Sequence, residues 1–408
     1  MHSNMRTIAS LLLSLDVRLS AAPVLLRKNA AGSRMSFSLS GQFIVALLAL
    51  SGCGLTHNPE VQPDPAHPVL ALGAAAPDFS LPGADGKTHT LGEFADSTVL
   101  AIVFDCNHCP QSHLYEASIK KLYADYRPKG VALVAVSPNN PASVPYDELA
   151  YSDMNDSLAE MTTRVTDRHL EYPCLYDGES QSLSGKLGAV ATPHVFIFDR
   201  NRKLRYQGRI EDASNAIDAV LAGKPVAVAQ TPVSGCATKW LPKKASENPE
   251  PVTMQMTTPD ILKKLRGNGT GKLLLVNFWA TWCGPCVAEF PDLQDTFRMY
   301  RGRNFSLVTV SEDVPGAKPD VLAFLQKNHA STINYLFSSD DTSAVQDSFD
   351  PKMSGAVPFT LLLAPNGDVL YQEQGEISMA KLRRTILANL PDDKEHPGQQ
   401  AYWADSLK

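Results

Sequence analysis

Two copies of the motif Cys-x-x-Cys constrain this chain more than any other feature, because each copy lies in the same setting. The apolar run Leu100–Phe104 leads to Cys106 and Cys109, and a second apolar run leads to Cys283 and Cys286. Such a run predicts a buried strand, and the residues after each pair have the spacing of a helix. A dithiol at a strand–helix junction, present twice, indicates two dithiol redox domains in one polypeptide.

Each motif is followed, further along the chain, by a proline that opens another apolar run. The two sequences are Thr192-Pro193 and Val357-Pro358. From their position we expect both prolines to follow a cis peptide bond, a geometry that is almost confined to proline. Such a bond would hold a backbone edge beside the dithiol for a substrate chain. These four residues are therefore candidate substrate-binding residues.

Length and composition fit a globular protein with more than one domain. A chain of 408 residues is too long for one ordinary core. Its hydrophobic content of 44% and charged content of 20% are ordinary values. The net charge of −6 and the lack of a dense Lys/Arg run argue against a nucleic-acid partner.

The N-terminal region indicates export. The apolar run Phe43–Leu50 is long enough for the core of a signal peptide and too short to span a bilayer. Leu50-Ser-Gly-Cys53 resembles the lipobox of a bacterial lipoprotein, which implies removal of residues 1–52 and lipidation of Cys53. The alternative is a plain secretory signal or a short anchor with an incidental cysteine. In both cases we expect a periplasmic or cell-envelope location.

A dithiol at the start of a helix has a defined chemistry. The unpaired N–H groups and the helix dipole stabilise an anion there and lower the pKa of the first thiol. That thiolate attacks a target disulfide, and the second thiol resolves the mixed disulfide.

The second half of the chain resembles a known family at its motif. Residues 257–392, with Asn277-Phe-Trp-Ala-Thr-Trp-Cys283-Gly-Pro-Cys286 and Glu289, are similar to the TlpA/ResA group of membrane-tethered bacterial thioredoxins. The resemblance implies that Cys283 is the nucleophile, Cys286 the resolving thiol and Glu289 a proton-managing group. The alternative for Glu289 is a solvated helix carboxylate.

The first half resembles the peroxiredoxin-like redoxins of the AhpC/TSA group. The matching stretches include Ala76-Pro-Asp-Phe79, Phe104-Asp-Cys-Asn-His-Cys-Pro110 and Gly235-Cys-Ala-Thr-Lys-Trp240. True peroxiredoxins place Thr or Ser three residues before the peroxide-attacking cysteine, whereas here Cys106 lies three residues before Cys109. This replacement favours disulfide exchange over peroxide reduction.

Together these resemblances imply an α/β fold class with two tandem thioredoxin-fold domains, each a central mixed sheet flanked by helices. The expected element order is β-α-β-α-β-β-α, repeated in the second domain. The expected divisions are a lipoprotein signal peptide (1–52), a tether (53–71), a peroxiredoxin-like domain (72–229), a linker (230–256), a TlpA/ResA-like domain (257–392) and a polar tail (393–408).

Two histidines and two further cysteines are candidate site residues. His108 precedes the second cysteine of its pair and would stabilise the first thiolate, which makes the couple more oxidising. The alternative is a merely solvated His108. His194 would face the Cys106 site, or pack in the strand end. Cys174 is expected to be an inert buried thiol, and Cys236 is a candidate resolving thiol for the first domain or a partner of Cys174.

These observations predict an exported thiol-disulfide oxidoreductase in which electrons pass from Cys283/Cys286 to Cys106/Cys109 and then to an acceptor. A thiol peroxidase with its own fused reductant is the alternative. A Cu(I) carrier that uses Cys106, Cys109 and a nearby His is a weaker one. Neither pair is followed by His, so c-type haem attachment is excluded. We expect no cofactor beyond the redox-active disulfides and no resident metal, with protein clients and an upstream membrane thiol reductant as partners.

Overall fold

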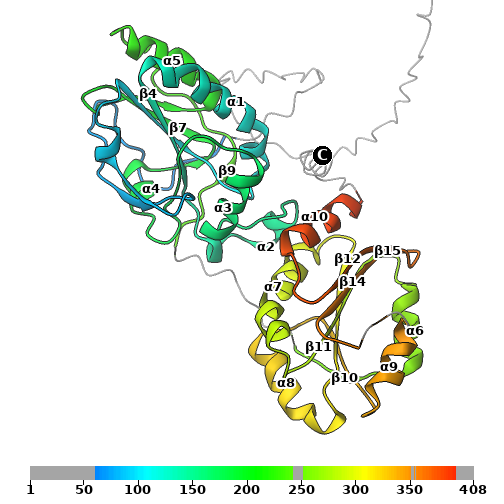
Figure 1. Cartoon of the computed structure of the whole chain (residues 1–408). Coiled ribbons are helices and arrows are strands. Elements are labelled where there is room, and N and C mark those ends of the chain that lie inside the picture. Colours follow the sequence, from blue (N-terminus) through cyan, green and yellow to red (C-terminus); the bar gives the residue numbers. More distant parts are fainter. Residues whose placement is uncertain (1–59, 242–250, 351–352, 354, 392–408) are drawn as a thin grey trace, which may run out of the picture. The chain divides into compact units, whose positions relative to one another are not determined.

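The computed structural model describes residues 60–241, 251–350, 353 and 355–391 (Figure 1). The predicted signal peptide, Cys53 and the polar tail after residue 392 lie outside the described residues. Within the described ranges, no helix combines the length and apolar character needed to cross a membrane. Two mixed β-sheets dominate these ranges, as the predicted fold class requires.

The first sheet has five strands in the order β5-β4-β3-β7-β8. Its strands are β3 (Val99–Phe104), β4 (Val131–Ser137), β5 (Cys174–Tyr176), β7 (His194–Phe198) and β8 (Leu204–Gly208). Strands β3, β4 and β5 are parallel, whereas β7 and β8 join antiparallel. All six residues of β3 are buried, because helices cover both faces of a central strand.

The helices of this first region place alternate residues of β3 in two cores. Val99, Ala101 and Val103 pack with residues of α1 (Pro110–Tyr126) and α5 (Ala213–Leu221). Their neighbours along the strand face α4, on the opposite side of the sheet. The remaining elements of the region are α2 (Tyr146–Leu149), α3 (Leu158–Asp167), α4 (Ser182–Leu187), β1 (Ser80–Pro82), β2 (Thr88–Thr90), β6 (Ala191–Thr192) and β9 (Cys236–Ala237).

The second sheet has six strands in the order β10-β13-β12-β11-β14-β15. Its strands are β10 (Gln255–Met256), β11 (Leu273–Trp279), β12 (Phe305–Ser311), β13 (Ile333–Leu336), β14 (Phe359–Leu363) and β15 (Val369–Gln374). Its helices are α6 (Pro259–Gly267), α7 (Gly284–Tyr300), α8 (Lys318–Lys327), α9 (Thr342–Phe349) and α10 (Met379–Asn389). Alternate residues of β11 again point to opposite cores, one beside α7 and α10 and the other beside α6 and α9.

Both dithiols therefore lie where the sequence predicts, between a central strand and the helix that follows it. The expected linker, residues 230–256, is partly built into the fold, because it contains the strands β9 and β10. Val233 is buried beside Val190, and the His67 ring stacks on the Trp240 ring. Residues of both flanking stretches, including Val69 and Trp240, thus pack against the core of the first region.

Candidate functional site

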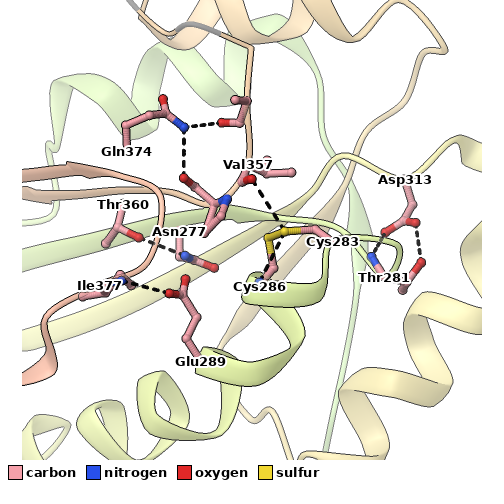
Figure 2. Close-up of a disulfide and its surroundings, with 12 residues drawn as sticks. Asn277, Thr281, Cys283, Cys286, Glu289, Asp313, Val357, Thr360, Gln374 and Ile377 are labelled. Atoms are coloured by element: carbon pink, nitrogen blue, oxygen red, sulfur yellow. Dashed lines mark hydrogen bonds between the residues drawn. A yellow bond between two sulfur atoms is a disulfide. The ribbon is translucent and has the colours of Figure 1, made fainter.

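The second dithiol lies at the N-terminus of α7. Cys283 is the residue that caps this helix, and the backbone N–H of Cys286 donates to its sulfur at 3.3 Å. The two sulfurs are joined by a disulfide (Figure 2). Cys283 is 6% exposed, but its neighbour Trp282 is 69% exposed. The pair therefore lies close to a surface with an apolar side chain that a partner could cover.

A cis peptide bond joins Val357 to Pro358 beside this disulfide, as predicted. The carbonyl oxygen of Val357 lies 3.6 Å from the Cys283 sulfur. Figure 2 shows Gln374 on the other side of this backbone turn, where its Nε2 donates to the Pro358 carbonyl at 3.0 Å. The side chain of Gln374 thus helps to fix the edge that faces the dithiol.

Glu289 lies on α7 one turn beyond Cys286 and is buried, so it is not the solvated surface carboxylate of the alternative interpretation. Burial raises the pKa of Glu289 to about 7, against the lowering effects of the Ile377 N–H and the Asn277 amide. The Ile377 N–H donates to Glu289 Oε2 at 3.1 Å, as Figure 2 shows. A carboxyl group that titrates near neutral pH is suited to giving and taking protons.

The first dithiol differs because its helix starts later. Helix α1 begins at Pro110, so the capping residue is Cys109, the second cysteine of the pair. Cys106 lies in the loop after β3, and both thiols are free and buried. The Cys106 sulfur lies 3.1 Å from Thr192 Oγ1, and the Cys109 thiol donates to the Thr192 carbonyl at 3.2 Å.

His108 is held by carboxylates and is not solvated. Its Nδ1 lies 2.6 Å from Asp156 Oδ2 and 3.6 Å from the Cys106 sulfur, and its Nε2 lies 3.6 Å from Glu148 Oε2. Burial alone would lower the pKa of His108, but the charge and hydrogen bond of Asp156, followed by Glu148, raise it to about 10. A positive imidazolium therefore lies beside the thiols at neutral pH.

The expectation that the first thiol of each pair has the lower pKa is wrong for this pair. Burial raises the pKa of Cys106, and its hydrogen bond to Cys109 and the charge of Asp156 add to that effect. Burial also acts to raise the pKa of Cys109. However, the thiols of Cys106 and Cys236 and the charge of His108 lower it well below its usual value. The position of Cys109 at the helix N-terminus favours its thiolate in the same direction.

The peptide bond before Pro193 is cis, as predicted, but the histidine after it does not face the dithiol. His194 Nδ1 accepts from the Val190 N–H, and its Nε2 lies 2.8 Å from Gln207 Oε1. Burial lowers the pKa of His194 to about 4, so this ring is neutral. His194 is a packed strand residue, which is the second of the two predicted alternatives.

The two remaining cysteines have separate surroundings. Cys174 lies on β5, where burial raises its pKa to about 12, as expected for an inert thiol. Cys236 lies on β9 opposite Thr192, and its sulfur lies within 4.8 Å of a ring nitrogen of His108, so it faces the dithiol and not Cys174. A Cys174–Cys236 pair, one of the two alternatives, does not match this arrangement.

Two carboxylates and an arginine of the site were not predicted. Asp156 and Glu148 lie between β4 and β5, and Arg164 of α3 donates to the Cys106 carbonyl at 2.7 Å. Asp156 Oδ1 also accepts from the backbone N–H groups of Asn107 and His108. No local motif marks these residues, because they reach the dithiol from a separate part of the chain.

Two groups of side chains among the described residues have the donor types of a metal site. These are Cys106, His108 and Asp156, and His108, Glu148 and Cys236. Asp156 Oδ2 already lies 2.6 Å from His108 Nδ1, and Lys239 Nζ lies 2.6 Å from Glu148 Oε2. A metal ion would have to break these ion pairs and deprotonate His108, since metals bind neutral imidazole. The residues therefore fit an ion-pair network better than the proposed Cu(I) site.

Comparison with known proteins places the chain in a family. The sequence model of the AhpC/TSA family matches two stretches, residues 72–207 and 257–372. The chain belongs to this family. Each match contains one of the two dithiols, so both regions of this AhpC/TSA protein carry the family pattern.

Curated relatives of this chain are thiol-disulfide oxidoreductases named ResA. The thiol-disulfide oxidoreductase ResA of Oceanobacillus iheyensis is 32% identical over 112 residues, which are 28% of this chain and 54% of that protein. ResA of Bacillus subtilis is 30% identical over 108 residues, which are 26% of this chain and 56% of that protein. The chain thus spans about half the length of these curated relatives.

Solved structures give partial matches. A hypothetical protein from Sinorhizobium meliloti 1021 is 33% identical to this chain, with a TM-score of 0.40. The match covers 45% of this chain and 100% of that protein. A thiol-disulfide oxidoreductase from Bacteroides fragilis is 18% identical, with a TM-score of 0.26. The match covers 33% of this chain and 89% of that protein.

Proposed function

We propose that this protein is an exported thiol-disulfide oxidoreductase that exchanges disulfides with protein clients through two unlike dithiols. The observation that carries the proposal is the second site, where Cys283 caps α7 beside the backbone edge of Val357 and cis-Pro358. The similarity to ResA proteins supports the same activity.

The reaction at the second site follows from these positions. In the reduced protein, the Cys283 thiolate attacks a client disulfide and forms a mixed disulfide, which releases one client thiolate. Cys286 then loses its proton and attacks the Cys283 sulfur, which releases the second client thiolate and leaves the Cys283–Cys286 disulfide. The client gains two electrons and the dithiol loses two. Glu289, buried one turn beyond Cys286 with a pKa raised to about 7, is the group that we assign to proton exchange with Cys286.

We propose that the first dithiol is the more oxidising of the two and receives electrons from the second. The imidazolium of His108 and the N-terminus of α1 both stabilise the Cys109 thiolate. A stabilised thiolate favours the reduced form of a pair, which raises its reduction potential. In contrast, Gly284 and Pro285 between the second pair are typical of reducing thioredoxins. Equal potentials of the two pairs, each measured in a full chain with the other pair changed to serine, would contradict this direction.

The location and the other partners remain proposals from the sequence. The lipobox-like segment that ends at Cys53 supports a lipid-anchored envelope protein. Outside the cytoplasm the dithiols need a supply of electrons, so a membrane thiol reductant is the proposed upstream partner.

Peroxide reduction is the second candidate function, and one observation favours it. Cys109, at the position of the peroxide-attacking cysteine in the resemblance to peroxiredoxins, caps α1 and has a lowered pKa. Against it, Cys109 is fully buried, and the cavity beside Cys106 measures about 20 Å³. A space of that volume holds one water molecule.

One experiment separates the two functions. The reduced chain is supplied with hydrogen peroxide or with a protein disulfide such as insulin, beside Cys106→Ser, Cys109→Ser and Cys283→Ser variants. Disulfide exchange predicts fast reduction of insulin that needs Cys283, with peroxide consumption no faster than that of a free thiol. Fast peroxide consumption that is lost in Cys109→Ser would instead establish a peroxidase.

A further inference from the structure

We propose that Cys236 is a third redox thiol of the first site, presented by a strand that occupies the position of a client chain. The inference rests on the proposed disulfide exchange at this site and adds the residue that receives the disulfide from Cys109. Three observations lead to it: the pairing of β9, the packing that fixes β9 in place, and the arrangement of the three sulfurs.

Strand β9 pairs with the backbone edge that lies beside the dithiol. Thr192, the residue before cis-Pro193, pairs antiparallel with Cys236, and Ala191 pairs with Ala237. An extended peptide that adds to an exposed edge in this way is a common mode of client recognition. In the second region, no strand of the described residues pairs with Val357, the corresponding residue before cis-Pro358. The first edge is thus already filled by the chain itself.

Side chains and backbone on both sides of Cys236 fix this strand. Gly235 has φ of +149°, and a Cβ atom there would lie 2.1 Å from the Thr192 carbonyl oxygen. Thr238 Oγ1 donates to the Ala189 carbonyl at 2.8 Å, and the Lys239 N–H donates to Asn139 Oδ1 at 2.9 Å. The close approach at Gly235 lets the backbone of β9 lie directly against Thr192, which brings Cys236 to the dithiol.

Thr192 brings the three thiols of the first site together. The Cys109 and Cys106 sulfurs both contact Thr192, at 3.2 Å to its carbonyl oxygen and 3.1 Å to its Oγ1, and Thr192 is the strand partner of Cys236. The Cys236 sulfur also lies within 4.8 Å of a ring nitrogen of His108. Cys106 and Cys109 are 2% and 0% exposed, whereas Cys236 is partly exposed. The third thiol therefore connects a buried pair to the surface.

The exchange needs no additional oxidant. Starting from a Cys106–Cys109 disulfide, the Cys236 sulfur loses its proton and attacks the Cys109 sulfur. The Cys109–Cys236 bond forms, the Cys106–Cys109 bond breaks, and Cys106 leaves as a thiolate that takes up one proton. One disulfide is present before and after, so no net electrons are transferred. His108 Nδ1, 3.6 Å from the Cys106 sulfur, stabilises the leaving thiolate.

The test is disulfide mapping by mass spectrometry on the full chain. The chain and its variants are oxidised with oxidised glutathione, free thiols are blocked with an alkylating reagent, and digested peptides are identified without reduction. In the Cys106→Ser variant we expect a Cys109–Cys236 peptide as the main first-region disulfide. In the Cys236→Ser variant we expect Cys106–Cys109. The Cys174→Ser variant is the matched control and should have the unchanged pattern.

A second variant tests the strand independently of the thiol. Gly235→Ala keeps all three cysteines but moves β9 away from Thr192. We expect alkylation of Cys109 in the reduced protein to become about tenfold faster, equivalent to about 1.4 kcal/mol. The yield of the Cys109–Cys236 peptide should fall in the same variant when Cys106→Ser is added. Retention of the peptide at full yield would contradict the role of β9.

The outcomes separate this inference from the proposed function. A Cys106→Ser chain in which Cys236 stays fully alkylated, while the wild-type chain forms Cys106–Cys109, would overturn the third thiol and leave disulfide exchange intact. If oxidised glutathione links neither pair in the first region of any variant, disulfide exchange at this site fails and the third thiol fails with it.

Discussion

The two dithiols share a motif and a strand–helix junction, but the helix begins at a different point relative to each pair. Helix α7 begins at Gly284, within the pair, so Cys283 is its capping residue. Helix α1 begins at Pro110, after the pair, so the capping residue is Cys109. Since a helix N-terminus stabilises an anion, this change of register moves the favoured thiolate from the first cysteine to the second. The spacing of a Cys-x-x-Cys motif alone does not define which thiol is the nucleophile.

The two sites also differ in their surroundings. The first pair is fully enclosed, with a buried imidazolium and a strand of the same chain on its substrate edge. The second pair lies beside the exposed Trp282, and its main ionisable neighbour is the buried carboxyl group of Glu289. We call the Cys283/Cys286 pair the outer site and the enclosed Cys106/Cys109 pair the inner site. The contrast agrees with the proposed transfer of electrons from the outer to the inner pair.

The largest expected effect is at the outer site. Cys283→Ser should reduce the rate of insulin reduction to background, because no other thiol of that pair caps a helix beside the cis-proline edge. Cys174→Ser, which changes a thiol with a pKa raised to about 12, should leave the rate unchanged. The measurement is the initial rate of turbidity increase with a chemical reductant. Equal rates of insulin reduction for the two variants would mean that Cys283 is not the thiol that reduces the client.

The next effect concerns the ion pair that distinguishes the inner site. Asp156→Asn leaves the buried His108 imidazolium without its main partner and should destabilise the protein by about 3–5 kcal/mol. The pKa of His108 is raised from 6.5 to about 10, so this stabilisation is complete below pH 6.5 and is lost as pH rises toward 10. Urea midpoints at several pH values test both statements.

The control for this prediction is a carboxylate at the surface. Asp125→Asn breaks an exposed ion pair with Lys121, which is worth about 0–1 kcal/mol. Its urea midpoints should follow those of the wild type at every pH. An Asp156→Asn variant as stable as Asp125→Asn at pH 6 would refute the ion-pair account of the inner site.

A smaller effect tests proton transfer at the outer site. Glu289→Gln should lower the rate of insulin reduction by about 100-fold and remove the inflection near pH 7 from its pH profile. Glu312→Gln is the matched control, because burial also raises the pKa of Glu312 to about 7, but its carboxylate accepts from Gln346. An inflection that persists in Glu289→Gln and disappears in Glu312→Gln would assign the proton to the other carboxyl group.

The smallest effect concerns the exposed apolar side chain at the outer site. Trp282→Ala should raise KM for insulin about fivefold with little change in kcat, as for one contact worth about 1 kcal/mol. Leu114→Ala, on α1 and 56% exposed, should leave KM unchanged. Steady-state kinetics of insulin reduction give KM and kcat for both variants. A fall in kcat alone would mean that Trp282 supports the reaction and not client binding.

The sequence predicts the fold well because the strands that build it are continuous apolar runs. Leu100–Phe104 is an example, since every residue of that run is buried in β3. The prediction for the thiols missed the later helix start at the first pair, although a proline at the first helical position marks a helix start and Pro110 follows that pair. Pro285, by contrast, lies inside the second pair.

The rest of the inner site could not be predicted because it depends on contacts between distant residues. Asp156 is an ordinary polar residue of a loop, and its role depends on contacts with His108 and Asn139 that only the fold creates. Cys236 lies in a stretch with the composition of a linker, and its pairing with Thr192 is a tertiary contact. The same holds for the lowered pKa of Cys109, which depends on three other side chains.

The most direct test is the pH dependence of alkylation at each cysteine of the fully reduced chain, quantified by mass spectrometry. The midpoint of rate against pH reports the thiol pKa independently of the absolute rate. We expect Cys109 to reach half of its maximal rate at lower pH than Cys106, and Cys283 to do so at lower pH than Cys286. A midpoint for Cys106 below that of Cys109 would show that the later helix start does not move the reactive thiol to the second position.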